Sequence, residues 1–247
     1  MSTASLPLHA AWQRDGFVPA GRVLDDAALA GLRAEEQALR AQSPDAAAST
    51  QFFGLVARHC PTLRHLALHG PHLDLVAQLV GPDLVLWWNQ FVTKLPDADP
   101  LRGQFRWHQD NGYQDVQPGT NLTIWIALDD VDTTNGCVWV VPGSHRAGLL
   151  PHRQPNPDSW HLETPVTEPG IPVPLPAGHA VMFSGYTLHR SLANASAAPR
   201  RALFLQYAPA GAMRFKHGVA QGLVEESTEA WVVRGRTAIG RRTPMAG

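Results

Sequence analysis

The chain has 247 residues, of which 44% are hydrophobic and 17% charged, and its formal net charge is −1. This length and composition suit one globular domain with a substantial core, and they exclude a disordered chain, a bilayer-spanning protein and a basic surface for nucleic acid or membranes. The N-terminus lacks a secretory signal, and the two cysteines, Cys60 and Cys137, lie far apart, so we expect a cytoplasmic protein without a disulfide framework.

The first third of the chain, residues 1–82, predicts helices. Residues 24–42 contain strong helix formers after Asp25 or Asp26, either of which can serve as the N-cap. Residues 61–81 predict two helices.

The second of these segments is broken at Gly70 and Pro71 and also contains a His-x-Asp pair, His72 and Asp74. On a helix, residues two apart point to nearly opposite sides, so this pair cannot chelate a metal. We interpret it as polarity on the helix surface.

From Asp83 onward the pattern changes to segments rich in β-branched and aromatic residues, separated by proline, glycine and asparagine. Within residues 121–128 the leucines and isoleucines face one way, and Asn121, Thr123 and Trp125 face the other. One face is apolar and the other carries functional groups, as expected for the wall of a small barrel with a site inside. The predicted strands lie within residues 83–95, 120–131, 137–144, 179–189 and 201–209.

Residues 150–176 are proline-rich and irregular, and they contain His152, Arg153 and Trp160, so we expect a lid or substrate loop. The chain is expected to form a single domain. Its parts are a helical region at residues 1–82, a β core at 83–210 and a weakly patterned C-terminal extension at 211–247.

The most informative residues are His108, Asp110 and His189. The first two form a His-x-Asp pair on a predicted strand, where residues i and i+2 point to the same side and converge on one ion. A distant strand can bring His189 to the same point. Two imidazoles and one carboxylate are the ligand set of non-haem iron(II) oxygenases, which leaves other metal positions open.

Four motifs in order resemble the phytanoyl-CoA dioxygenase family of Fe(II)/2-oxoglutarate-dependent oxygenases. They are WHQD, WIALDD, NGCVWVVPGSHRAG and LPAGHAVMFSGYTLHRSLANASAAPRRALFLQYAP. The resemblance covers roughly residues 12–210. It implies a mainly β fold with N-terminal helices and a double-stranded β-helix core of the jelly-roll or cupin-like type.

The resemblance implies that His108, Asp110 and His189 bind Fe(II) and that Arg200 binds the far carboxylate of 2-oxoglutarate. A guanidinium fork matches a carboxylate in a bidentate way. The neighbouring Arg201 is expected to point outward into a surface ion pair. Four further residues match positions around the 2-oxoglutarate pocket: Ser191, Trp125, Gln90 and Thr123. For Gln90 and Thr123, ordinary strand polarity is an equal alternative.

Several residues near these motifs are expected to be structural. The side chain of Gln109 should point away from the metal. His145 lies in a turn and is not a ligand; it is expected to be structural or to lie near the substrate. Residues 135–136 predict a hairpin turn that joins two strands. Asp129 and Asp130 end a strand, with a carboxylate pair for glycoside chemistry as a remote alternative.

Two positions are informative when this chain is compared with the family pattern. Many members have an upstream lysine near the co-substrate pocket, whereas this chain has none before Lys94, and we assign that role to no residue. Halogenating relatives have a small residue where this chain has Asp110, so hydroxylation is favoured over halogenation.

The resemblance therefore implies an Fe(II)-dependent dioxygenase that uses 2-oxoglutarate and O2, hydroxylates a C–H bond of a small organic metabolite, and releases succinate and CO2. Nucleic acid and membranes are not expected partners. Two alternatives remain, a zinc-type metal hydrolase and a non-catalytic jelly-roll module that binds a ligand.

The family acts on lipids, amino acids, osmolytes and natural-product intermediates, so the resemblance does not identify the substrate. The aromatic and arginine residues near the motifs favour a small, partly apolar and possibly carboxylated molecule. The candidate contacts are Phe105, Trp107, Tyr113, Trp139, Trp160, Tyr186, Arg102, Arg106, Arg153 and Arg190.

Overall fold

The computed structural model describes residues 5–43, 49–97, 99, 101, 103–119, 121–156 and 160–236. The α-helices lie in the N-terminal third and most strands follow, as predicted. No helix in these ranges is long and apolar enough to cross a membrane. The α-helices are α1 (Ser5–Asp15), α2 (Asp26–Ala41), α3 (Pro61–His69) and α4 (Leu73–Val80), and the 3-10 helices are η1 (Val56–Arg58), η2 (Asp110–Gly112), η3 (Ser144–Ala147) and η4 (Val224–Glu226).

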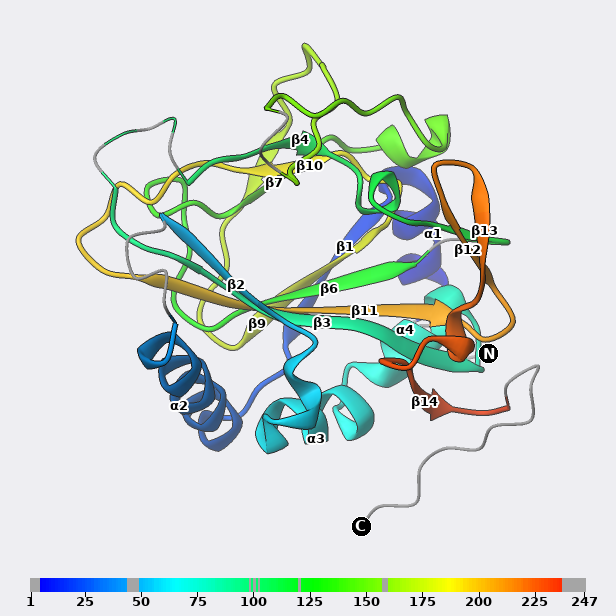
Figure 1. Ribbon diagram of the computed structural model, residues 1–247, viewed down its shortest axis with the longest axis horizontal. Helices are drawn as coiled ribbons and strands as arrows, with labels where there is room; N and C mark the ends of the chain where they lie inside the picture. Colours follow the sequence, from blue (N-terminus) through cyan, green and yellow to red (C-terminus); the bar gives the residue numbers. More distant parts are fainter. Residues whose placement is uncertain are drawn as a thin grey trace.

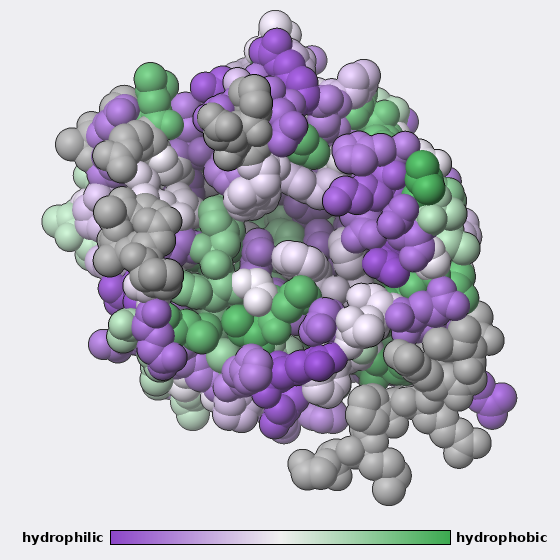
Figure 2. Space-filling model, in the orientation of Figure 1, coloured by the Kyte–Doolittle hydropathy of each residue, from purple (hydrophilic) through white to green (hydrophobic). Residues whose placement is uncertain are grey.

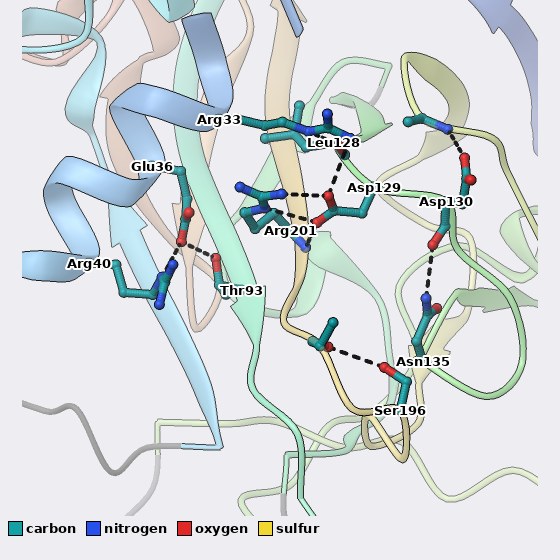
Figure 3. Close-up of polar contacts among 12 residues, drawn as sticks. Arg33, Glu36, Arg40, Thr93, Leu128, Asp129, Asp130, Asn135, Ser196 and Arg201 are labelled. Carbon is teal, nitrogen blue, oxygen red and sulfur yellow. Dashed lines mark hydrogen bonds and ion pairs between the residues drawn. The ribbon is translucent and has the colours of Figure 1, made fainter. Parts of the chain in front are cut away.

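Helix α2 begins where the sequence predicts. Asp25 is the N-cap, and its carboxylate accepts a hydrogen bond from the backbone N–H of Ala28 at 2.7 Å. Farther along, the buried carboxylate of Glu36 accepts hydrogen bonds from Thr93 at 2.7 Å and from Arg40 at 3.2 Å (Figure 3). These bonds fix α2 against the strand that carries Thr93.

The interpretation of His72 as a surface group is wrong. Its side chain is 1% exposed, and its ring Nε2 lies 2.9 Å from the hydroxyl of Tyr207. The residue is the N-cap of α4, and burial lowers the pKa of its ring to about 4. Only Asp74 is exposed, and it forms an ion pair with Arg234 at 2.8 Å.

The larger sheet is antiparallel and forms one wall of the barrel (Figure 1). Its central strand pair, β11 and β3, is flanked by β6 on one side and by β2 and β14 on the other. The helices cover its outer face. Its strands are β1 (Phe17–Arg22), β9 (His179–Ser184), β6 (Leu122–Ala127), β11 (Arg200–Pro209), β3 (Leu84–Lys94), β14 (Trp231–Arg234) and β2 (Thr50–Gly54).

A smaller antiparallel sheet lies above the inner face of the larger one (Figure 1), and the surface is hollowed between the two sheets (Figure 2). This two-sheet arrangement is the predicted jelly-roll core. The smaller sheet consists of β4 (Phe105–His108), β10 (His189–Ser191), β7 (Val138–Val140) and β8 (Ile171–Val173), and a third sheet consists of β13 (Val219–Leu223), β12 (Met213–Lys216) and β5 (Asp115–Gln117).

Strand β6 shows how alternation separates the two faces of the larger sheet. Leu122, Ile124 and Ile126 join the core beneath the helices, whereas Trp125 joins the cluster inside the barrel. Thr123, two residues before Trp125, also points inward and reaches Asp110. The predicted division into an apolar and a functional face is therefore confirmed.

Two expectations about connections need correction. Residues 135–136 form a turn, but it does not close a hairpin, because β6 and β7 belong to different sheets. The C-terminal extension is more regular than its pattern suggests: β12 and β13 form a hairpin, and β14 pairs with β3 of the larger sheet. Residues 237–247 of this extension lie outside the described ranges.

Candidate metal centre

The three predicted ligands meet between the two sheets. His108 ends β4, Asp110 begins η2 and His189 begins β10, and the two histidines face each other across the β4–β10 pair. Asp110 Oδ1 lies 3.5 Å from His189 Nε2 and 3.9 Å from His108 Nε2. Metal–ligand bonds of roughly 2.1 Å would separate neighbouring ligand atoms by about 3 Å. The three side chains, each at most 8% exposed, are thus close to the spacing for a shared ion.

Backbone carbonyls fix the orientation of both imidazoles. His108 Nδ1 donates to the carbonyl of Arg106 at 2.7 Å, and His189 Nδ1 donates to the carbonyl of Thr187 at 2.9 Å. A carbonyl can only accept, so Nδ1 carries a proton in each ring and Nε2 is the atom directed toward Asp110.

The protonation states also suit metal binding. Burial, followed by the nearby His189, lowers the pKa of His108 well below its usual value, so this ring is neutral. Burial alone would raise the pKa of Asp110, but His189, His108 and the Thr123 hydroxyl together lower it. A neutral imidazole and an ionised carboxylate are the forms that bind cations.

Thr123 supports Asp110 from the floor of the barrel. Its hydroxyl donates to Asp110 Oδ2 at 2.6 Å, which directs Oδ1 toward the histidines. Gln206, opposite Thr123 on β11, donates to the same hydroxyl at 3.2 Å. The hydroxyl proton of Thr123 is thus committed to Asp110, and its predicted contact with 2-oxoglutarate stays a prediction.

Gln109, between two of these residues, is fully buried. As expected, its side chain is used elsewhere: the amide nitrogen donates to the carbonyls of Gly148 and Tyr186, and the amide oxygen accepts from Leu150 N–H. Its backbone N–H donates to His152 Nε2 at 3.0 Å. Gln109 therefore ties the loops around the centre together.

A second group of polar residues lies where β3 ends and β11 begins. Arg200 is 1% exposed; its Nη2 donates to the carbonyl of Gly136 at 2.9 Å, and its guanidinium carbon lies 5.3 Å from the centre of the Trp125 ring. Its Nη1 is buried and has no hydrogen-bond partner in the described part of the chain. Burial lowers the pKa of Arg200 to about 10, so the group is still a cation at neutral pH.

Lys94 lies beside Arg200 and is the residue that sequence reasoning missed. The two residues are opposite each other in the β3–β11 pair, and Lys94 is 1% exposed. Its Nζ donates to the carbonyls of Gly103 at 2.5 Å, Leu192 at 2.6 Å and Ser191 at 3.3 Å. Burial and then Arg200 lower its pKa well below the usual value. The available signal was a lysine, one of only two in the chain, at the end of an apolar strand.

No ion pair joins Lys94 or Arg200 to a carboxylate in the residues that the structure describes. We call this pair the cationic end. An uncompensated buried charge is costly, and two neighbouring ones are more so. The cationic end is therefore suited to an anion that enters the barrel.

The other residues predicted around 2-oxoglutarate line the same interior. Trp125 is buried beside Arg200, and Ser191, half-buried, ends the strand that begins with His189. Gln90 lies farther along β3, and its amide oxygen accepts from Trp88 Nε1 at 3.0 Å. The assignment of these residues to the binding of 2-oxoglutarate stays a prediction.

Residues expected to be structural behave as such. Arg201 points to the opposite side from Arg200 and donates to both carboxylate oxygens of Asp129 at 2.6 and 2.9 Å (Figure 3). Asp130 accepts from the backbone N–H of Ala177 at 2.8 Å. His145 Nε2 lies 3.1 Å from the carbonyl of Gln13, at the end of α1, and this contact involves none of the metal ligands.

Three of the candidate substrate contacts lie on the outer face of the smaller sheet. The Arg190 guanidinium is held between the rings of Trp107 and Trp139, at 4.6 and 5.1 Å. These groups therefore stack with one another outside the barrel. Arg102 lies outside the described residues.

The proline-rich segment forms a cover over β4. The backbones of Arg153 and Glu163 exchange two hydrogen bonds of 2.9 Å, and Glu163 also binds the side chains of Arg153 and Arg106. Between these ends the chain carries Trp160 and His161 back onto Phe105. We call residues 153–163 the cover loop, of which 157–159 lie outside the described residues.

Comparisons with known proteins agree on one family. The model of the family described as "Phytanoyl-CoA dioxygenase (PhyH)" matches residues 12–202. A "Probable phytanoyl-CoA dioxygenase" of Caenorhabditis elegans is 26% identical over 209 residues, which cover 70% of this chain and 67% of that protein. A "Methylphosphonate hydroxylase" of Gimesia maris is 28% identical over 212 residues, 79% of this chain and 77% of that protein. Two further curated relatives align over only 36% and 48% of their own lengths.

Among solved structures, one similar chain is the epimerase SnoN in complex with Fe3+, alpha ketoglutarate and nogalamycin RO. It is 29% identical, the TM-score is 0.72, and the match covers 87% of this chain and 88% of that chain.

Proposed function

The chain belongs to the phytanoyl-CoA dioxygenase family, and we propose that it is an Fe(II)- and 2-oxoglutarate-dependent dioxygenase that hydroxylates an unactivated C–H bond of a small organic metabolite. Iron, 2-oxoglutarate and an oxygenase-type reaction follow from the family and from the solved relative that binds Fe3+ and alpha ketoglutarate. The particular reaction and substrate are the proposed part.

One observation carries the proposal: the His108, Asp110 and His189 group shares the barrel interior with a cationic end that lacks a carboxylate. The donor set of two imidazole nitrogens and one carboxylate oxygen fits iron(II). The unpartnered, buried Arg200 Nη1 fits one carboxylate oxygen of a bound diacid. The residues present therefore fit both groups.

When bound, iron(II) with 2-oxoglutarate and O2 supplies the oxidising power for C–H hydroxylation, and succinate and CO2 are the other products. His108, Asp110 and His189 would hold the metal from one side. Thr123 keeps Asp110 turned toward the histidines, and Arg200 with Lys94 would orient the diacid by its far carboxylate. The buried apolar residues around this interior would limit the access of water to the bound groups.

Asp110 supports hydroxylation over halogenation. Its side chain occupies the third ligand position, 3.5 Å from His189 Nε2, and so fills the space that halogenating relatives keep for chloride. The similar chain SnoN is an epimerase, so enzymes of this fold reach different outcomes with the same cofactors.

A zinc-type hydrolase is the second candidate, because the three ligands alone would suit it. It gives no role to the cationic end, where Lys94 and Arg200 lie buried without a carboxylate partner among the described residues. A non-catalytic binding module gives no role to the open metal face. We therefore favour the oxygenase.

We further propose that residues 1–247 act as one oxygenase domain in the cytoplasm. The N-terminal β2 and the C-terminal β14 both pair with β3 of the core, which supports a single unit. Cys60 and Cys137 are free and buried, which suits a reducing compartment.

The proposal is tested by measuring succinate release from 2-oxoglutarate in the presence of Fe(II), with Zn(II) as the matched control. We expect succinate with iron and none with zinc. No succinate with iron, together with a hydrolytic activity that requires only zinc and does not depend on 2-oxoglutarate, would favour the second candidate.

A further inference from the structure

The backbone between the two ligands of the His-x-Asp pair lies at a break between two elements. Strand β4 ends at His108 and η2 begins at Asp110, so Gln109 alone joins them, in an extended conformation with φ −116° and ψ 140°. The conformation of this one residue sets how the imidazole and the carboxylate are placed relative to each other. The contacts that hold Gln109 therefore bear directly on the metal centre.

Residues 148–152 hold Gln109 through both its side chain and its backbone. The amide nitrogen of the side chain donates to the carbonyl of Gly148, and the amide oxygen accepts from the N–H of Leu150, both at 2.8 Å. The backbone N–H of Gln109 donates to His152 Nε2 at 3.0 Å. One short segment thus grips the residue between the two ligands.

The imidazole of His152 is itself fixed at both nitrogens. Its Nδ1 lies 2.7 Å from the carbonyl of Leu150, which can only accept, so Nδ1 carries the proton. Nε2 then has the lone pair that the N–H of Gln109 needs. Burial lowers the pKa of His152, which favours this neutral form. Both ring nitrogens are therefore already used by backbone groups.

Gly112, the last residue of η2, provides the space for this ring. A Cβ atom at this position would lie 2.5 Å from His152 Nε2, 2.6 Å from its Cε1 and 2.7 Å from its Cδ2. The φ angle of Gly112 is outside the left-handed region, so the position uses the small size of glycine and not its backbone freedom. A larger residue would displace the ring or the turn that follows Asp110.

We propose that His152 is a positioning residue of the metal centre, which fixes the backbone of Gln109 and thereby the relative placement of His108 and Asp110. This inference rests on the proposed function, because it concerns the metal of the same enzyme. The sequence-based expectation assigned His152 to a lid or substrate loop, whereas its ring binds the backbone between two metal ligands.

The first test removes the ring and then restores the acceptor. In His152→Ala the N–H of Gln109 loses its partner, and Fe(II) affinity should fall by about fivefold, the effect of one neutral hydrogen bond. His152→Gln carries an amide oxygen that can accept the same bond, and it should restore most of the affinity. The matched control is His145→Ala, which removes a half-buried histidine of η3 that contacts the carbonyl of Gln13; its Fe(II) affinity should equal that of the wild type.

A second variant breaks the same contact without changing His152. Gly112→Ala should push the ring away from Gln109 and weaken Fe(II) binding about as much as His152→Ala does. In the double variant the ring is absent, so the added methyl group should cause no further loss. Such non-additivity is expected when two substitutions act on one contact.

Two measurements are made on each variant. Anaerobic equilibrium dialysis gives the dissociation constant for Fe(II), and electron paramagnetic resonance of the Cu(II)-loaded protein reports the ligand geometry and the number of coordinated imidazoles. His152→Ala and Gly112→Ala should change the copper hyperfine splitting and keep the imidazoles of His108 and His189. Thermal unfolding of the metal-free proteins is followed in parallel, because a purely structural role would lower the unfolding temperature and leave the spectrum unchanged.

An unchanged spectrum and an unchanged Fe(II) dissociation constant in His152→Ala would overturn the proposal. Additive losses in the double variant would also overturn it, because Gly112 would then act without His152. Loss of one coordinated imidazole in His152→Ala would make this residue a ligand instead. Should His152→Ala not fold, the comparison of Gly112→Ala with the wild type decides in the same way.

The wild type separates this inference from the proposed function. Wild-type protein that binds neither Fe(II) nor Cu(II) at this centre would contradict the proposed function itself. If the wild type binds Fe(II) and 2-oxoglutarate and the variants match it, only the role of His152 is wrong.

Discussion

The metal centre and the cationic end differ in how their charges are balanced. At the metal centre the carboxylate of Asp110 faces two imidazoles and accepts a hydrogen bond from Thr123. At the cationic end Lys94 and Arg200 are equally buried, but their hydrogen-bond partners among the described residues are backbone carbonyls. The first group is assembled by the fold, whereas the second is complete only when an anion is bound.

This difference separates what each region contributes. The metal ligands are held by backbone carbonyls and one hydroxyl, so they should keep their arrangement without 2-oxoglutarate. At the cationic end, burial disfavours the charged forms of Lys94 and Arg200, and a bound diacid would offset this cost. Binding of 2-oxoglutarate should therefore stabilise the folded protein by more than its contacts with the metal alone would give.

The largest effect is expected at the metal centre. Asp110→Ala removes the carboxylate ligand of the metal centre. Iron affinity should fall by more than about 100-fold, which exceeds the loss expected when a residue that only supports a ligand is removed. Iron content after dialysis and succinate release measure this loss. The matched control is Asp74→Ala, which changes the exposed His-x-Asp carboxylate on α4; equal loss in both variants would contradict the assignment.

The next effect is expected at the cationic end. Arg200→Gln removes a buried partner of the diacid, which should cost about 2–5 kcal/mol and raise the dissociation constant for 2-oxoglutarate by at least about 30-fold. Iron affinity should not change. Arg201→Gln is the matched control, because it disrupts only the outer pair with Asp129, and an equal effect on 2-oxoglutarate in this variant would argue against Arg200.

A smaller effect tests the support beneath the metal. Thr123→Val keeps the shape of the side chain but loses the hydrogen bond to Asp110, so iron affinity should fall by about tenfold. If Thr123 instead bound 2-oxoglutarate directly, the variant would weaken 2-oxoglutarate and leave iron unchanged. Parallel titrations of both ligands distinguish the two roles.

The smallest effect concerns pH. Because the pKa of Lys94 is lowered in the fold, the unfolded chain binds more protons between that folded pKa and the usual 10.5. The free energy of unfolding without 2-oxoglutarate should therefore gain a contribution that rises with pH across this window, by less than about 1.4 kcal/mol per unit.

Urea unfolding of the wild type and Lys94→Met over this range measures that contribution as the difference in slope. The slope should disappear in Lys94→Met and diminish in the wild type with 2-oxoglutarate, which favours the charged ammonium. Identical slopes in the two proteins would show that Lys94 makes no such pH-dependent contribution to the free energy of unfolding.

The ligand set could be predicted from sequence because its geometry is local. His108 and Asp110 are two residues apart at the end of a strand, and the motif after β9 brings His189 opposite them. The same reasoning rejected His72 as a metal ligand, and the structure places this residue outside the metal centre. However, the sequence-based interpretation placed His72 at the surface, which is wrong. Its burial depends on Tyr207, a contact between distant segments that no local period reveals.

Of the two residues of the cationic end, only one could be predicted from the sequence. Arg200 follows from the family pattern, whereas the position of Lys94 depends on the register between β3 and β11. Similarly, the arginines near the motifs look alike in sequence. Only the fold separates Arg190, stacked between two tryptophan rings outside the smaller sheet, from Arg106, which forms an ion pair with the buried Glu163.

The most direct test of the central claim is an anaerobic titration of the iron(II)-loaded protein with 2-oxoglutarate, followed by the visible charge-transfer absorption. A saturable band should appear in the wild type, require much more 2-oxoglutarate in Arg200→Gln, and be absent in Asp110→Ala. Iron-loaded wild-type protein that shows no band with excess 2-oxoglutarate would contradict a metal centre built to receive this co-substrate.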